Sequence, residues 1–186
     1  MVRTLNDPAV RHGGYEGYRT PVSAEDVTAK LEADDRHLFL ACRKGTPIGS
    51  ASLKDIDLEG RKAEPGYWIA PDEQGNAYAT EAADLCLTHA FDELGLHEVW
   101  ARTVGDNDAS NRVLEKLGFQ REGVIGEHWY GFGRDVDEHR FGLLESERQE
   151  FSGAQDRHDH PLAVGSEQSV SVRHRRRTDS VLLSRP

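Results

Sequence analysis

Apolar positions along the central part of the chain repeat with two periods, one typical of helices and one typical of strands. Between residues 78 and 94 they recur every three or four positions, which is the spacing of one helix face. The residues on that face are Ala79, Ala83, Cys86, Leu87, Ala90 and Leu94. Gly95 follows directly, and glycine readily takes the left-handed conformation that ends a helix. The pattern therefore predicts a helix over residues 78–94.

Two shorter helices are predicted from the residues at their ends. Ser23 is a good N-cap, and the acidic residues after it favour the first turn of a helix that ends near residue 33. Another short helix is predicted over residues 109–117, with Gly118 at its end.

Short apolar or alternating runs bounded by turn residues predict the strands. They cover residues 37–43, 47–53, 63–70, 97–104, 119–127 and 136–144. Residues 44–46 read as the turn of a hairpin, and Pro71 stops the third strand. Strands and helices that alternate in this way predict an α/β fold with a mixed sheet.

The character of the chain changes after residue 150. Residues 151–186 contain no Lys, Trp or Tyr and show no sustained periodicity. We expect one domain over residues 1–150 and a disordered tail over residues 151–186. The basic cluster at residues 173–177 is more typical of a solvated segment than of a nucleic-acid arm, and His158 and His160 are a weaker indication of metal binding. A frame error in this segment is a further possibility, because its composition departs sharply from that of the body.

The charge is strongly acidic, with 33 acidic against 23 basic residues and a net charge of −10. Arg far outnumbers Lys, and this composition is typical of proteins kept soluble at high salt, which suggests a halophile-like protein. An alternative interpretation is that the acids attract cationic substrates. Either way, the balance argues against broad nucleic-acid binding, which needs dense basic residues.

Neither a membrane segment nor a metal site is predicted. No apolar run reaches the length of a membrane helix and no signal core follows Met1, so a cytoplasmic location is expected. Cys42 and Cys86 lie in apolar patterns without metal-type spacing and are expected to be buried free thiols.

Candidate chemistry begins at the loop that follows the strand ending in Trp68, Ile69 and Ala70. The small residues Gly75, Ala77 and Ala79 lead directly into the predicted helix at residue 78. The first turn of a helix has backbone N–H groups without intrahelical partners and a partial positive charge, so it receives a phosphate well. Ordinary tight turns also use glycine and alanine, and the loop alone leaves that alternative open.

A second segment, residues 104–119, reads VGDNDASNRVLEKLGF. Together with the first it resembles the GNAT superfamily of acetyl-CoA-dependent N-acetyltransferases, and more narrowly its RimJ/RimL-type branch. The acetyl-CoA loop of that family has Arg or Gln, two residues, Gly, one residue, and Gly or Ala. This pattern falls on Gln74, Ala77 and Ala79, and Ala77 departs from the family's glycine.

The resemblance implies a fold and a coenzyme site. The fold is a mixed, mostly antiparallel central sheet flanked by helices, here lacking the first edge strand because little sequence precedes Leu5. The residues implied to bind acetyl-CoA are Trp68, Ile69, Ala70, Gln74, Gly75, Asn76, Ala77, Tyr78, Ala79, Thr80, Asn107 and Ser110. In relatives the strand backbone pairs with the pantetheine arm and supplies an N–H to the oxyanion.

Glu64 is the candidate general base, because relatives place a carboxylate at this strand that removes the amine proton. Its alternative is a solvated acid at a strand start. Pro65, next to it, cannot donate to a sheet ladder and predicts a bulge or a splayed edge.

The general acid is less clear. Many relatives carry a Tyr seven residues after the Asn that matches Asn107, but Leu114 stands there. Ser110 matches a Ser that RimJ/RimL-type relatives have near the thiolate, and a plain first-turn Ser is the alternative; Tyr130 or water are other candidates. For Asn107 the alternative is an N-cap, which is compatible with coenzyme binding.

The resulting hypothesis is an N-acetyltransferase that moves an acetyl group from acetyl-CoA directly to a primary amine, without a metal or an acyl-enzyme. The amine is a protein N-terminus or a small molecule, and the enzyme is a monomer or a homodimer. A non-catalytic acyl-CoA-binding or regulatory module is the alternative, favoured by Ala77 and by the absent Tyr.

Overall fold

The computed structural model describes residues 5–7, 10, 21, 23, 25–26, 36–131, 133–148, 170–175 and 180–183. Most of the helix expected after Ser23 lies outside this part of the chain, but its cap lies within. The Ser23 hydroxyl accepts a hydrogen bond from the Asp26 amide (3.0 Å), and the Asp26 carboxylate accepts one from the Ser23 amide (2.8 Å). This reciprocal pair confirms Ser23 as an N-cap.

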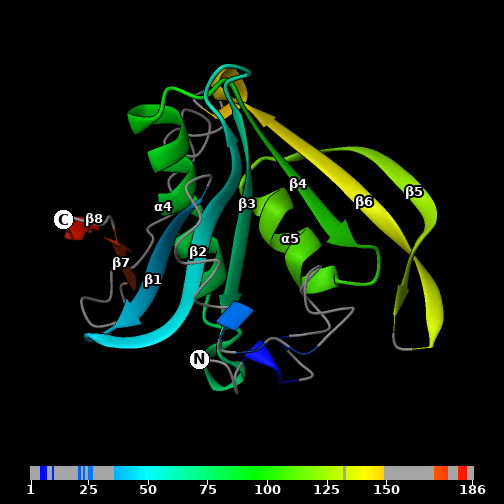
Figure 1. Ribbon diagram of the computed structural model, residues 1–186, viewed down its shortest axis with the longest axis horizontal. Coiled ribbons are helices and arrows are strands. Elements are labelled where there is room, and N and C mark those ends of the chain that lie inside the picture. Colours follow the sequence, from blue (N-terminus) through cyan, green and yellow to red (C-terminus); the bar gives the residue numbers. More distant parts are fainter. Residues whose placement is uncertain are drawn as a thin grey trace, which may run out of the picture.

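The described elements form one sheet with helices beside it (Figure 1). The strands are β1 (His37–Arg43), β2 (Thr46–Asp57), β3 (Lys62–Ile69), β4 (Glu98–Val104), β5 (Gln120–Gly131), β6 (Arg134–Leu144), β7 (Val170–Arg175) and β8 (Ser180–Leu183). The helical elements are the 3-10 turn η2 (Pro71–Glu73), helix α4 (Tyr78–Thr88), the π-helical turn η3 (His89–Glu93) and helix α5 (Asp108–Lys116). The sheet order is β5-β6-β4-β3-β2-β1-β7-β8, and β3 and β4 form the single parallel pair. The mixed, mostly antiparallel sheet of the sequence prediction is confirmed.

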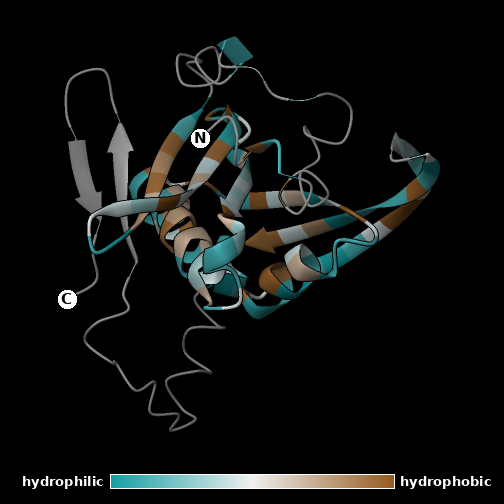
Figure 2. Ribbon diagram, turned by 90° about the horizontal axis from the view of Figure 1, so that it is seen from below, coloured by the Kyte–Doolittle hydropathy of each residue, from teal (hydrophilic) through white to brown (hydrophobic). Residues whose placement is uncertain are grey.

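The two faces of the sheet differ in chemistry. On one face, strand residues such as Leu53, Val99 and Phe141 join residues of α4 and α5 in a single buried core. Figure 2 shows the hydrophobic side of these helices turned toward the sheet. The opposite face carries polar side chains that are also buried, among them Lys54 and Glu64. Strand alternation explains this division, since successive side chains point to opposite faces.

Strands β3 and β4 separate soon after they begin. They pair only at Lys62 with Glu98 and at Ala63 with Val99, whereas β3 continues to Ile69 and β4 continues along β6. Figure 1 shows the two strands diverging, with α5 beside the opening. Pro65 lies just past the last β3–β4 pair, so the splayed edge predicted from that proline is confirmed.

The helix expected over residues 78–94 is present but changes type. It is α-helical to Thr88 and continues as η3, after which Gly95 takes a positive φ of 61°. His89, the first residue of η3, is 2% exposed. Its Nε2 lies 2.9 Å from Nδ1 of His37, and its Nδ1 lies 2.8 Å from a carboxylate oxygen of Glu93. These polar partners make the burial of the imidazole ring possible.

Part of the C-terminal segment is ordered into strands, which the sequence prediction of a disordered tail did not include. β7 pairs antiparallel with β1, and β8 pairs with β7. The alternation Val170, Ser171, Val172 is too short to read as a strand by itself, but the open edge of β1 supplies hydrogen-bonding partners for it. The edge of β1, for which the sequence analysis expected no partner strand, is thus paired with β7.

Candidate active site

The loop between β3 and α4 is held in shape by its own polar side chains. Gln74 donates from Nε2 to the carbonyl oxygen of Ile69 (2.9 Å), which ties the loop to the end of β3. Asn76 donates from Nδ2 to the carbonyl oxygen of Glu73 (3.1 Å). Both side chains therefore brace the loop, and its backbone is left to face a ligand.

The backbone of this loop opens into α4 without a side-chain cap. Gly75 has φ 80°, and Ala77, the N-cap, has φ 63° in the left-handed region. The first intrahelical bond runs from the Glu81 amide to the Ala77 carbonyl (3.1 Å), so the amides of the three preceding residues have no intrahelical acceptor. Those residues are Tyr78, Ala79 and Thr80. The N-terminus of α4 therefore has the geometry that favours a pyrophosphate.

At the end of β3, the backbone N–H and C=O groups of every second residue face the opening between β3 and β4. The Ala70 amide donates to the Ile48 carbonyl on β2 (2.8 Å). Because hydrogen bonding alternates along an antiparallel pair, Trp68 also directs its backbone to β2, whereas Tyr67 and Ile69 direct theirs to the opening. Of the three β3 residues expected to hold the pantetheine arm, only Ile69 presents its amide to the opening.

The start of α5 forms the other side of the opening. Asn107 is its N-cap, and its Oδ1 accepts a hydrogen bond from the Ser110 amide (3.1 Å). Thr103 on β4 donates from Oγ1 to Oδ1 of Asn111 (2.6 Å), which fixes α5 against β4. The N-cap role of Asn107 is confirmed.

A tyrosine that the sequence analysis gave no catalytic role reaches Ser110 from β3. The Tyr67 hydroxyl lies 2.9 Å from Ser110 Oγ and donates to the Ser110 carbonyl oxygen at 3.3 Å. Burial raises the pKa of Tyr67, and its hydrogen bond with Ser110 offsets this only in part. The phenol therefore stays protonated at neutral pH.

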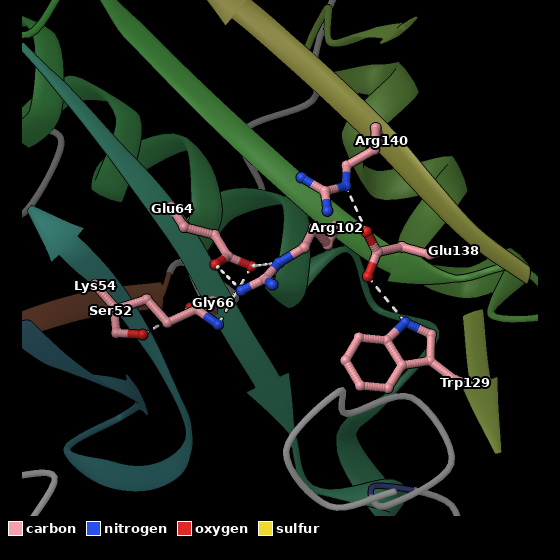
Figure 3. A network of polar contacts seen from close by, with 8 residues as sticks. All are labelled: Ser52, Lys54, Glu64, Gly66, Arg102, Trp129, Glu138 and Arg140. Atoms are coloured by element: carbon pink, nitrogen blue, oxygen red, sulfur yellow. Dashed lines mark hydrogen bonds and ion pairs between the residues drawn. The ribbon is translucent and has the colours of Figure 1, made fainter. Parts of the chain in front are cut away.

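Glu64 is buried on the polar face, 2% exposed, between two cations (Figure 3). Its Oε1 lies 3.2 Å from Lys54 Nζ, and its Oε2 accepts from an Arg102 terminal nitrogen at 2.8 Å. Arg102 Nε also donates to Oε1 (3.3 Å). The candidate base thus lies beside the opening with both oxygens in ion pairs, and it is not the solvated acid considered as its alternative.

A second buried carboxylate lies farther along the same face. Glu138 accepts from Trp129 Nε1 (2.8 Å) and pairs with Arg140. Arg102 and Arg140 both lie over the Trp100 ring, at 5.0 and 6.0 Å from its centroid. The polar face therefore carries alternating acids and guanidinium groups around an aromatic ring.

The structure brings most of the expected site residues together around the opening and adds several. Glu64, Ser110, Asn107 and the loop over residues 74–80 border it, whereas the Tyr130 side chain is 69% exposed on β5. The residues that sequence reasoning missed are Tyr67, Lys54, Arg102 and Asn111. Strand alternation places Lys54, Glu64 and Arg102 on one face once the register is known, whereas the roles of Tyr67 and Asn111 have no comparable signal in the sequence.

Within the described residues, no group of three or more His, Cys, Asp or Glu side chains is arranged to hold a metal ion. No helix in the same part of the chain is long and apolar enough to cross a membrane. Cys42 and Cys86 are buried free thiols, as expected.

Comparison with known proteins identifies relatives that match most or about half of this chain. The profile of the acetyltransferase (GNAT) domain family matches residues 1–120. The uncharacterised N-acetyltransferase YoaA of Bacillus subtilis is 35% identical over 145 residues, which cover 75% of this chain and 82% of YoaA. A spermidine N(1)-acetyltransferase of Vibrio cholerae is 31% identical over 99 residues, covering 53% and 57% of the two chains.

Solved structures share the fold. The spermidine N-acetyltransferase from Vibrio cholerae, in complex with CoA and spermine, has a TM-score of 0.70 at 22% identity and covers 79% of this chain and 89% of that one. Acetyl-CoA is the acetyl donor of such enzymes. The chain therefore belongs to the GNAT acetyltransferase family and is an acetyl-CoA-dependent N-acetyltransferase.

Proposed function

We propose that this enzyme is of the RimJ/RimL type and transfers the acetyl group directly to a primary amine in the opening between β3 and β4. The observation that carries this is the opening itself. The anion-receptive start of α4 lies at the end of β3, and Ser110 lies on α5 across from that strand. One arrangement therefore serves both the coenzyme phosphates and the reacting end of the pantetheine arm.

In this proposal the chain holds the coenzyme mainly through backbone. The amides of residues 78–80 receive the pyrophosphate, with Gln74, Gly75, Asn76 and Ala77 shaping the turn. The outward-facing amide of Ile69 is in position to hold the acyl oxygen as it gains charge. Asn107 and Ser110 contact the arm from the α5 side, and Trp68 and Ala70 support the strand from the β2 side.

Attack is direct, because neither cysteine offers a usable nucleophile at the site. Burial raises the pKa of the Cys86 thiol, so it stays protonated on the core face of α4. Cys42 is buried on β1, away from the β3–β4 opening in the sheet order. The acceptor amine must therefore attack the thioester itself and lose its proton to a base.

Glu64 is the base that we propose, directly or through a water molecule. It lies at the point where β3 and β4 part, on the sheet face opposite α4 and α5. Lys54 and Arg102 hold both of its oxygens in ion pairs and so fix the orientation of the carboxylate.

For the acceptor we propose a single primary amine, such as a protein N-terminus or a small amine. Among the relatives are a candidate ribosomal N-acetyltransferase of Bacillus subtilis, YdaF (37% identical over 103 residues, 55% of this chain and 56% of that one), and the spermidine enzymes. Glu64 and Glu138, the two buried acids of the polar face, already pair with cations. A polycation such as spermidine would have to displace those partners, whereas a single amine would not.

Replacing Glu64 with Gln tests the assignment. A general base contributes about 10²–10⁴-fold to rate, so we expect kcat to fall at least about 100-fold, while calorimetric titration shows acetyl-CoA binding retained. Glu138→Gln is the matched control, because it removes a second buried, paired carboxylate of the same face. We expect that variant to keep kcat within about threefold of the wild type.

Two outcomes would contradict these assignments. Because unpairing a buried charge costs about 3–5 kcal/mol of unfolding free energy, the melting temperature of each variant is measured first. Wild-type turnover that survives in a folded Glu64→Gln variant removes Glu64 as the base. Coenzyme binding without turnover, on a panel of N-terminal peptides, small amines and spermidine, favours the non-catalytic module instead.

A further inference from the structure

The leaving group of the reaction needs a hydrogen-bond donor, and the family pattern does not provide the usual one here. When the tetrahedral intermediate collapses, the C–S bond breaks and its electron pair stays on the coenzyme sulfur. Leu114 stands at the position of the family's tyrosine, and its side chain is 1% exposed within the core. The donor must therefore come from another residue.

Tyr67 supplies a phenolic hydroxyl from the opposite side of the opening. Its side chain leaves the helix-covered face of β3 and ends at the first turn of α5, where it meets both oxygens of Ser110. The amide of the same serine is held by Asn107. Hydrogen bonds with Tyr67 and with Asn107 therefore hold Ser110 in place at the start of α5.

Building on the proposed function, we propose that Tyr67 is a positioning residue that orients the Ser110 hydroxyl toward the leaving sulfur. The phenol has one proton, and when it donates that proton to Ser110 Oγ instead of to the Ser110 carbonyl oxygen, the hydroxyl proton of the serine can point into the opening. Ser110 then donates a hydrogen bond to the sulfur as it takes up negative charge. The thiolate leaves with its electron pair and takes its proton from solvent after release.

The protonation state of the Tyr67 hydroxyl agrees with a positioning role. Burial raises the pKa of Tyr67, so the group keeps its proton over the whole range in which the enzyme works. A serine hydroxyl is likewise a donor that does not ionise near neutral pH. The pair therefore stabilises charge on the sulfur by hydrogen bonding, and neither member has to lose its proton.

Tyr67→Phe tests the proposal because it removes only the hydroxyl and keeps the packed ring. A small loss of positioning is costly in an active site, so we expect kcat to fall about tenfold, with KM for acetyl-CoA and its calorimetric affinity within about twofold of the wild type. Ser110→Ala should lower kcat at least as much. The double variant should match Ser110→Ala alone, because both changes remove one hydrogen-bonded unit.

Thr103→Val is the matched control, since it also removes a hydroxyl that joins a strand to α5. It should lower the melting temperature without a comparable loss of kcat. If Thr103→Val and Tyr67→Phe reduce kcat equally, the role of Tyr67 is structural. The proposal would also be overturned if the losses of kcat in Tyr67→Phe and Ser110→Ala multiply in the double variant. An unchanged kcat for Tyr67→Phe would overturn it as well.

The pH profile gives a second readout. We expect the loss in Tyr67→Phe to be the same at every pH, because the phenol does not titrate in the working range. A loss confined to alkaline pH would mean that Tyr67 is itself an acid, which contradicts a positioning role. A wild-type enzyme that binds acetyl-CoA but acetylates no amine defeats the proposed function, and this inference falls with it.

Discussion

Ala77 occupies a backbone conformation that suits glycine better than alanine. Its φ of 63° lies in the left-handed region, where the Cβ atom of an ordinary residue crowds the backbone at a cost of about 1–2 kcal/mol. The surrounding turn over residues 74–76 holds it there through its side-chain hydrogen bonds. The departure from the family's glycine therefore preserves the geometry of the loop and stores strain in it.

Ala77→Gly should stabilise the protein. Relief of the backbone strain should contribute more free energy than is lost through the greater entropy of glycine in the unfolded chain. We therefore expect the free energy of unfolding, measured in urea, to increase by about 0.5–1 kcal/mol. Ala79→Gly is the matched control, because the same change inside the first turn of α4 should cost about 1 kcal/mol. A loss of stability in both variants would show that Ala77 is not strained.

The same position tests the phosphate loop. Ala77→Asp places a carboxylate where the pyrophosphate is expected, so calorimetric titration should show acetyl-CoA binding weakened by at least about tenfold. Binding unchanged by this substitution would mean that the phosphates lie elsewhere.

Helix α5 depends on its first residue for both stability and the geometry of Ser110. Asn107→Ala removes the N-cap and should cost about 1 kcal/mol of unfolding free energy. Asn107→Ser keeps a capping oxygen but lacks the amide group. We expect the serine variant to retain most of the stability and to lose acetyl-CoA affinity in calorimetry; retention of both properties would limit Asn107 to capping.

The elements themselves were predictable wherever the signal is local. Gly95 and Gly118 mark helix ends, with positive φ values at both, and the strand residues from 37 to 144 follow from alternation and turns. The N-cap role of Asn107 was also predictable, because capping depends on neighbours in the sequence.

Contacts between elements were not predictable in the same way. Glu64 was recognised, but the two cations that hold it come from neighbouring strands whose register a single sequence does not specify. The contact of Tyr67 with Ser110 likewise depends on the distance between β3 and α5 in the folded protein, which a single sequence does not specify. The burial of His89 also depends on a partner in β1, His37, that lies 52 residues away in the sequence.

At the scale of the whole molecule, the net charge of −10 makes stability depend on salt. Self-repulsion of an acidic chain opposes compaction, and the Debye length shrinks from about 10 Å at 0.1 M to about 3 Å at 1 M salt. We expect the melting temperature to rise over this range of KCl concentration. Lowering the pH from 7 to 5 should reduce the gain, because less negative charge remains to be screened. A melting temperature that falls with KCl would contradict the halophile-like interpretation.

The pairing of β7 with β1 links the completion of the sheet to the order in which the chain is made. Phe39 and its neighbours in β1 leave the ribosome more than a hundred residues before their partners in β7. Until those residues emerge, a nascent chain that has already built β1 to β6 presents the edge of β1 without its β7 partner. Translation speed through the last segment therefore sets how long that edge stays open to other nascent chains.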